Sequence, residues 1–160
     1  MRVLGIDPGQ QTGLAWIEES PGGTFSLLGA QTVALDALIP VCVLSPAHSA
    51  VDLVVVEDWE YQGPKRARGV PHQAFAVGYV CGVLAANGRT PLRVTRTVVL
   101  SALGIPRAGK ARVAAFARRL VTPATPELMA SERTEHEWDA VAVAIAGLGM
   151  YARQMLAGIG

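Results

Sequence analysis

The chain begins with short apolar runs that end at turn-forming residues, which is the pattern of buried strands. Five such runs occur along the chain, at residues 3–7, 13–17, 25–30, 51–57 and 92–94. The second and third flank the sequence Ser-Pro-Gly-Gly at 20–23, which is typical of a hairpin turn. The valine-rich run at 51–57 is the clearest strand because no breaker interrupts it. These runs predict a sheet of five strands.

Longer segments predict helices between and after these strands. They occur at residues 33–44, 72–86, 96–103, 110–121 and 135–156. The first contains Pro40, which should kink or end it. The last is preceded by Thr134, and Thr134 and Glu137 have the spacing of a capping box. Strands that alternate with helices after an initial group of strands indicate an α/β fold.

Composition limits the class of protein. The chain has 160 residues, of which 51% are hydrophobic and 17% are charged, so residues 1–160 are expected to form one domain with a sizeable core. Cys42 and Cys81 have no spacing typical of a disulfide framework or a zinc site. No apolar stretch reaches the ~20 residues of a membrane span, and the first residues do not look like a signal peptide. We therefore expect a soluble, cytoplasmic protein.

The formal charge of +1 hides two unequal parts. Residues 61–126 contain eleven Lys and Arg and no acidic residue, which gives +11. The remaining 94 residues hold three basic and thirteen acidic residues, which gives −10. A long segment of one sign favours a surface for an anionic partner, although solvated helix faces balanced by acids elsewhere would give the same count.

Four side chains with metal-binding chemistry fall at the ends of predicted elements. Asp7 ends one strand, Glu57 ends another, and His136 and Asp139 share a face at the start of the last helix. Carboxylates at strand ends lie where α/β folds build their sites. Oxygen ligands with one imidazole suit Mg²⁺ or Mn²⁺. If the four converge, a divalent cation would relieve their mutual repulsion.

Each of these residues also has a structural interpretation. Asp7 precedes Pro-Gly and could cap a turn, Glu57 could pair with an arginine, and acids suit the first turn of a helix because of its dipole. Asp58 and Glu60 compete with Glu57 for its role. Asp58 would point to the opposite face of the strand, and Glu60 lies beyond the strand end.

Three motifs in order resemble the acidic motifs of the RuvC family of Holliday junction resolvases. They are GIDPG at 5–9, VVVED at 54–58 and HEWDAVAVAIA at 136–146. Lys110, in AGKARV, resembles a basic residue of that family. The last motif is more specific than GIDPG, which resembles strand–turn sequences of sugar-kinase-type ATPases. Many members have Asp where this chain has His136, which leaves the metal preference open.

The resemblance implies an RNase H-like fold, with a central mixed five-stranded sheet flanked by helices. It implies a crossover junction endodeoxyribonuclease that binds a four-way DNA junction and makes symmetric paired nicks, leaving 5′-phosphate and 3′-hydroxyl ends. Two Mg²⁺ or Mn²⁺ ions per site would be held by Asp7, Glu57, His136 and Asp139, with Lys110 stabilising charge on the phosphate.

Aromatic and basic residues that follow the second motif are candidates for DNA binding. The candidates are Trp59, Tyr61, Lys65, Arg66, Arg68, His72, Arg107, Lys110 and Arg112. By resemblance, an aromatic residue shortly after the second acid acts as a wedge at the junction, and Trp59 and Tyr61 are both candidates. Trp59 could instead belong to the core.

Residues 73–86 form a predicted helix with no charge on any face. Ala74, Gly78 and Gly82 are spaced by four and would make a smooth ridge for close packing of a second helix. By resemblance the protein is a homodimer, which suits the symmetric cutting of a junction. The alternative is a central core helix in a monomer.

Other functions remain open at this stage. The acids could be structural in a module that binds junctions without cutting them, and a distant group typified by YqgF implies action on structured RNA. An ATPase or kinase fragment is disfavoured because no second Asp-x-Gly motif follows. Flaps, forks and three-way junctions are further possible substrates.

Overall fold

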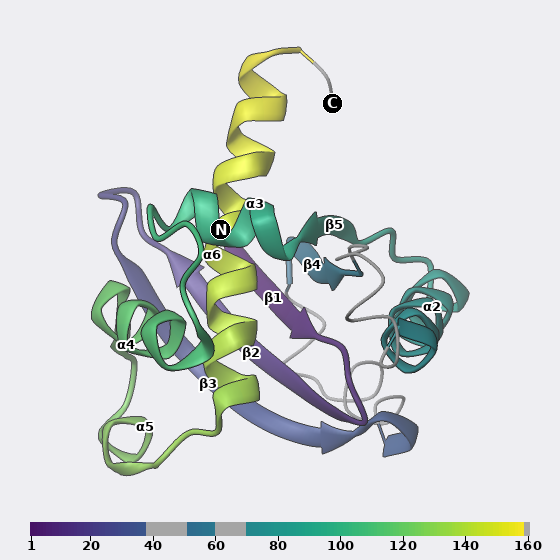
Figure 1. The fold of residues 1–160 in the computed structure, drawn as a ribbon. Coiled ribbons are helices and arrows are strands. Elements are labelled where there is room, and N and C mark those ends of the chain that lie inside the picture. Colours follow the sequence, from purple (N-terminus) through teal and green to yellow (C-terminus); the bar gives the residue numbers. More distant parts are fainter. Residues whose placement is uncertain (38–50, 60–69, 159–160) are drawn as a thin grey trace.

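The computed structural model describes residues 1–37, 51–59 and 70–158. Within these ranges a single sheet has the strand order β5-β4-β1-β2-β3-β6. The strands are β1 (Arg2–Asp7), β2 (Gln11–Glu19), β3 (Phe25–Ala34), β4 (Leu53–Asp58), β5 (Leu92–Thr95) and β6 (Val121–Pro123). A mixed α/β fold is thus confirmed (Figure 1).

The expected number of five strands is too low by one. The sixth strand, β6, pairs in parallel with the start of β3. Its three residues were assigned to the end of a helix and to a proline break, because so short a segment has no periodicity of its own. Only the neighbouring edge of β3 gives it strand geometry.

The antiparallel strands β1, β2 and β3 form the first half of the sheet. The predicted hairpin turn joins β2 to β3, and Gly23 has a φ of 73° there, which glycine adopts without strain. β3 continues to Ala34 and is followed by the 3-10 helix η1 (Leu35–Ala37). The helix expected from residue 33 onward is therefore wrong at its start, and residues 38–50 lie outside the described part of the chain.

Five α-helices surround the sheet in the described ranges. They are α2 (Val70–Ala86), α3 (Arg96–Ala102), α4 (Lys110–Leu120), α5 (Pro126–Ala130) and α6 (Glu135–Leu156). The helix α6 runs across one face of the sheet, where α3 and α4 pack against it, and α2 lies apart from them against β4 (Figure 1). Sequence periodicity found four of the five and missed the short α5.

Alternation along the strands divides the core into two clusters. Val3 and Val55 point toward α6 and belong to one cluster. Leu4, Val54 and Val56 point the other way, toward the buried side of α2. No helix in the described ranges is long and apolar enough to cross a membrane.

Candidate active site

Three parallel strands end at one edge of the sheet and supply half of the site. β4 pairs in parallel with β1 and with β5. Their carboxyl ends therefore bring Asp7, the end of β4 and the residue after β5 close together. Asp7 is the last residue of β1, Glu57 is the penultimate residue of β4, and Arg96 begins α3 directly after β5.

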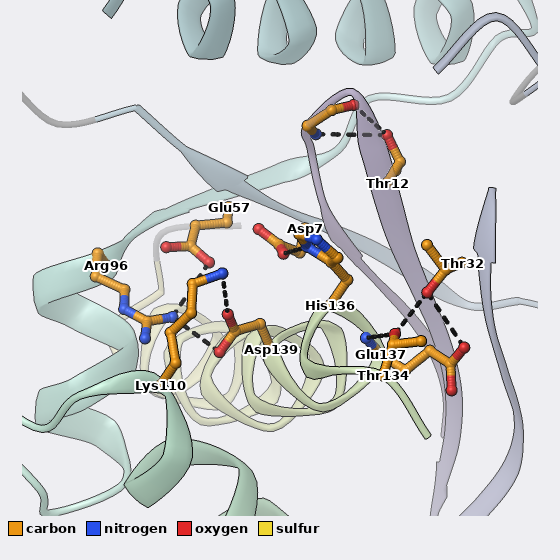
Figure 2. Close-up of polar contacts among 11 residues, drawn as sticks. Asp7, Thr12, Thr32, Glu57, Arg96, Lys110, Thr134, His136, Glu137 and Asp139 are labelled. Atoms are coloured by element: carbon orange, nitrogen blue, oxygen red, sulfur yellow. Dashed lines mark hydrogen bonds and ion pairs between the residues drawn. The ribbon is translucent and has the colours of Figure 1, made fainter. Parts of the chain in front are cut away.

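The first turns of α6 supply the other half. Thr134 is the N-cap, and its hydroxyl accepts a hydrogen bond from the backbone N–H of Glu137 at 3.2 Å. The Glu137 carboxylate does not complete the predicted box in the usual way, because it accepts from the Thr32 hydroxyl at 3.2 Å. Thr32 also lies 2.6 Å from the Thr134 hydroxyl. This polar cluster ties the start of α6 to β3 and so positions His136 and Asp139 (Figure 2).

Two strand glycines let α6 approach the sheet closely. A Cβ at Gly13 would lie 2.0 Å from the carbonyl oxygen of His136, and one at Gly5 would lie 2.1 Å from that of Ala140. Gly13 is also the register partner of Asp7 across β1 and β2. The close approach of α6 to Gly13 therefore lies next to the point where the strand residues and the helix residues of the site meet.

Three of the four predicted ligands line a cleft of about 890 Å³, and the fourth, His136, contacts one of them. Asp7, Glu57 and Asp139 line this cleft. His136 Nδ1 lies 3.2 Å from Asp7 Oδ2. Segments more than 120 residues apart in the chain thus meet at this point, as Figure 2 shows.

Two basic side chains contact the same carboxylates. Lys110 Nζ lies 3.4 Å from Asp139 Oδ2. Arg96 Nη1 lies 3.1 Å from Asp139 Oδ1 and 3.7 Å from Glu57 Oε2. Within the described ranges, no three His, Cys, Asp or Glu side chains are grouped tightly enough to hold a metal ion in these positions. Basic groups neutralise part of the acidic charge instead.

Burial and charge shift two of the pKa values. Burial, together with the nearby carboxylate of Asp7, raises the pKa of Glu57 to about 8. Glu57 Oε2 is buried and has no hydrogen-bond partner among the described residues. The hydrogen bond to Asp7 raises the pKa of His136, although partial burial opposes this. Ionisation of Glu57 is therefore unfavourable in this site unless further positive charge is supplied.

The structure distinguishes Glu57 from its neighbouring acid. Asp58 accepts a hydrogen bond from Arg93 at 2.7 Å and from the backbone N–H of Trp59 at 2.8 Å. Glu57 instead lies beside Asp139 and Arg96. The third competitor, Glu60, falls outside the described ranges.

The predicted DNA-binding residues fall into three groups. Trp59 and Arg107 line the cleft beside Lys110. Arg112 is exposed on α4 and His72 is exposed on α2. The remaining candidates, Tyr61, Lys65, Arg66 and Arg68, lie outside the described ranges. Trp59 is only partly buried and faces the cleft, which favours the wedge interpretation over the core one.

The described residues do not enclose the uncharged helix α2 on all sides. Ala74, Gly78 and Gly82 are exposed, and no described atom lies within 4 Å of a Cβ built at either glycine. Phe75 is 66% exposed and stacks on Tyr79. Among the described residues only one side of α2 packs against the sheet, so α2 does not have the all-round burial of a central core helix there.

Arg96 was not among the residues predicted for the site. The sequence did carry a signal, since Arg96 lies two residues after the end of a strand expected at 92–94. If that strand is parallel to the one that ends at Glu57, the residues just after it reach the same sheet edge. The pairing of Val94 with Glu57 in register confirms this geometry.

Comparison with solved structures gives full-length matches at low identity. RuvC of Thermus thermophilus matches with a TM-score of 0.69 and 22% identity, covering 97% of each chain. The same protein in complex with a Holliday junction substrate matches with a TM-score of 0.67 and 25% identity, covering 96% of each chain. The yeast mitochondrial Holliday junction resolvase Ydc2 matches with a TM-score of 0.65 and 12% identity, covering 99% of this chain and 81% of its own.

No family model matches the chain, and no curated protein matches its sequence. The structural matches nevertheless extend from end to end, and they include resolvases of the type that the three motifs resemble. The chain therefore has the RNase H-like fold of the RuvC-type Holliday junction resolvases.

Proposed function

We propose that this protein is a structure-selective DNA endonuclease that resolves four-way junctions by paired, symmetric nicks. The observation that carries the proposal is the grouping of Asp7, Glu57 and Asp139 along one cleft, with His136 in contact with Asp7. They come from three motifs that are far apart in the chain, and they meet within a fold shared with junction resolvases. Grouped carboxylates repel one another unless cations or protons offset their charge, so this arrangement supports a functional role.

The donor set suits divalent cations of the Mg²⁺ or Mn²⁺ type. Glu57 Oε2 is buried without a hydrogen-bond partner among the described residues, and its pKa is raised to about 8 by burial and by Asp7. Both features indicate acidic charge that a cation would stabilise. Asp7, Glu57, His136 and Asp139 would hold the ions. Two ions per site would supply Lewis-acid polarisation of the scissile phosphate and an activated water.

The side chains of the cleft have separate tasks in phosphodiester hydrolysis. His136, oriented by Asp7 through its Nδ1, would orient the attacking water. Lys110, which is about half exposed beside Asp139, would meet the negative charge that develops on the phosphate. The products would be 5′-phosphate and 3′-hydroxyl ends.

The cleft mouth and its surroundings would bind the junction. Arg107 and Lys110 lie at the cleft, and Arg112 follows on α4. Contacts to phosphates position DNA without reading its sequence, while Trp59 could stack on a base exposed at the branch point. Binding should therefore weaken steeply as salt rises, and a flat salt response would contradict a basic DNA-binding surface.

A two-fold dimer would present two such sites to one junction. The exposed ridge of Ala74, Gly78 and Gly82 on α2 is the surface that we assign to the second copy. Sedimentation of the full chain at micromolar concentration tests this, since a monomer would contradict the assignment.

The test of the proposed function is cleavage of a labelled immobile four-way junction with Mg²⁺ or Mn²⁺, with cuts mapped on all four strands. Symmetric paired nicks are expected on opposite strands, and linear duplex should stay intact. Binding without metal-dependent cutting would indicate a non-catalytic junction-binding module. Cleavage of structured RNA in preference to the junction would indicate a YqgF-like activity instead.

A further inference from the structure

Arg96 sits between two carboxylates of the candidate active site. Its Nη1 lies 3.1 Å from Asp139 Oδ1 and 3.7 Å from Glu57 Oε2. All three side chains are largely shielded from water, with 20% of Arg96, 14% of Glu57 and 3% of Asp139 exposed. Figure 2 shows the guanidinium reaching toward both acids. The contact is therefore part of the site and not a surface ion pair.

This position conflicts with metal binding by the same acids. Asp139 contacts Arg96 through Oδ1 and Lys110 through Oδ2, so both of its oxygens face a cation. A divalent ion bound between Asp139 and Glu57 would lie within a few ångströms of a fixed positive charge. Charge repulsion is much stronger at a shielded site than in water. Metal and guanidinium therefore cannot both occupy their best positions.

The geometry points to Arg96 as a displaceable counter-ion of the Glu57–Asp139 pair. Before metal binds, the guanidinium compensates the two acids, and it must withdraw when a divalent cation takes its place. Arg96 also lines the open cleft, so its side chain has room to move away from the acids. The inference rests on the proposed function, because it takes these carboxylates as metal ligands.

An arginine is well suited to this task for a physical reason. Its guanidinium keeps its charge at every physiological pH and presents several N–H groups in a fixed plane, so one side chain can serve two carboxylates. Lys110 is less suited, since it is about half exposed and contacts Asp139 alone among the described acids. The cost of displacing Arg96 lowers the metal affinity of the DNA-free protein.

The direct test is Mn²⁺ binding to the full chain without DNA, measured by isothermal titration calorimetry and by the electron paramagnetic resonance signal of free Mn²⁺. Arg96→Gln should bind Mn²⁺ about tenfold more tightly than wild type, because coupling across close, shielded charge pairs is at least of that size. Arg96→Lys should give a smaller gain, since its ammonium remains a competing charge. Neither readout depends on cleavage.

Arg93→Gln is the matched control. Arg93 also pairs with an acid at this sheet edge, at 2.7 Å from Asp58 Oδ1, but its side chain is 56% exposed. Its removal should leave Mn²⁺ affinity unchanged. Circular dichroism establishes that each variant is folded, and Arg96→Lys carries the test if Arg96→Gln does not fold.

Two outcomes overturn different claims. In the first, Asp139→Asn loses Mn²⁺ binding, but folded Arg96→Gln (or Arg96→Lys in its place) binds Mn²⁺ no more tightly than wild type. Arg96 is then not a competitor of the metal, and only this inference fails. If Asp139→Asn and Glu57→Gln both bind Mn²⁺ as wild type does, the metal site of the proposed function is wrong, and the role of Arg96 fails with it.

Discussion

Glycines serve opposite purposes on the two faces of the sheet. On the α6 face, Gly5 and Gly13 leave room for a helix backbone, and a Cβ at either would lie about 2 Å from a carbonyl oxygen of α6. On the other face, Gly78 and Gly82 of α2 adjoin open space within the described part of the chain. The first pair fixes the distance between two buried elements, whereas the second leaves a smooth surface uncovered.

The difference follows from what each face must do. The proposed catalytic side chains from β1, β4 and α6 have to lie close to one another, which requires close packing without flexible gaps. An exposed ridge of small residues, by contrast, leaves surface in contact with water, and the packing of a second helix could bury that surface. The α6 face therefore brings the candidate site together, whereas the described residues leave one side of α2 uncovered.

The largest expected effect is on cleavage, from a change of Asp7, whose carboxylate lies between the sheet and α6. Asp7→Asn should lower junction cleavage by at least about 10³-fold while leaving junction binding intact, because it removes a ligand without a change of shape. Single-turnover cleavage and a gel-shift assay measure the two properties. Asp58→Asn is the control. Asp58 pairs with Arg93 and not with the other candidate ligands, so its change should leave cleavage nearly unchanged. Wild-type cleavage by Asp7→Asn would mean that the site is elsewhere.

The next effect tests the close packing itself. Gly13→Ala would place a methyl group 2.0 Å from the His136 carbonyl oxygen, so β2 or α6 must shift. We expect a loss of about 3 kcal/mol in the free energy of unfolding, measured with urea, together with weaker cleavage. Gly29→Ala is the matched control, because its Cβ would meet Trp16 at an ordinary 3.6 Å. Equal stability of the two variants would contradict the tight α6 face.

A smaller effect concerns pH. The pKa of Glu57 is about 8 in the folded protein against an ordinary 4.5, so folding takes up a proton between these values. Stability of the metal-free protein should therefore fall by about 1.4 kcal/mol for each pH unit between these two values. Glu57→Gln should remove most of this dependence in urea titrations with a chelator. Glu18→Gln, on the surface beside Arg2, should not.

The smallest effect lies on the α2 face. Gly78→Ala should stabilise the folded chain by about 0.5 kcal/mol, because alanine favours helix and the position adjoins open space. The added methyl should weaken self-association if the ridge packs against a second copy, which sedimentation measures. Gly149→Ala, also with open space but on α6, should give the same stabilisation and unchanged association. Equal association for both variants would argue against the ridge.

Sequence patterns predicted much of the fold because several elements have local sequence signals. The runs around Val3 and Val55, the Thr134 cap and the turn before β3 are all local signals, and the structure places strands, a helix start and a hairpin there. Short elements were lost, because β6 and α5 contain too few residues for any periodicity. The candidate ligands were found in the same way, as polar residues at the ends of apolar runs.

The sequence by itself determined which acidic residues end which elements, and its three motifs indicated the fold. Strand alternation already favoured Glu57 over Asp58, but only the tertiary structure decided that Glu57 lies near Asp139 and that Arg96 joins them. It also decided that one face of α2 stays uncovered by the part of the chain that the structure describes. The reason is that strand order and the close approach of α6 depend on contacts between distant segments, and a single chain's local pattern carries no record of those distances.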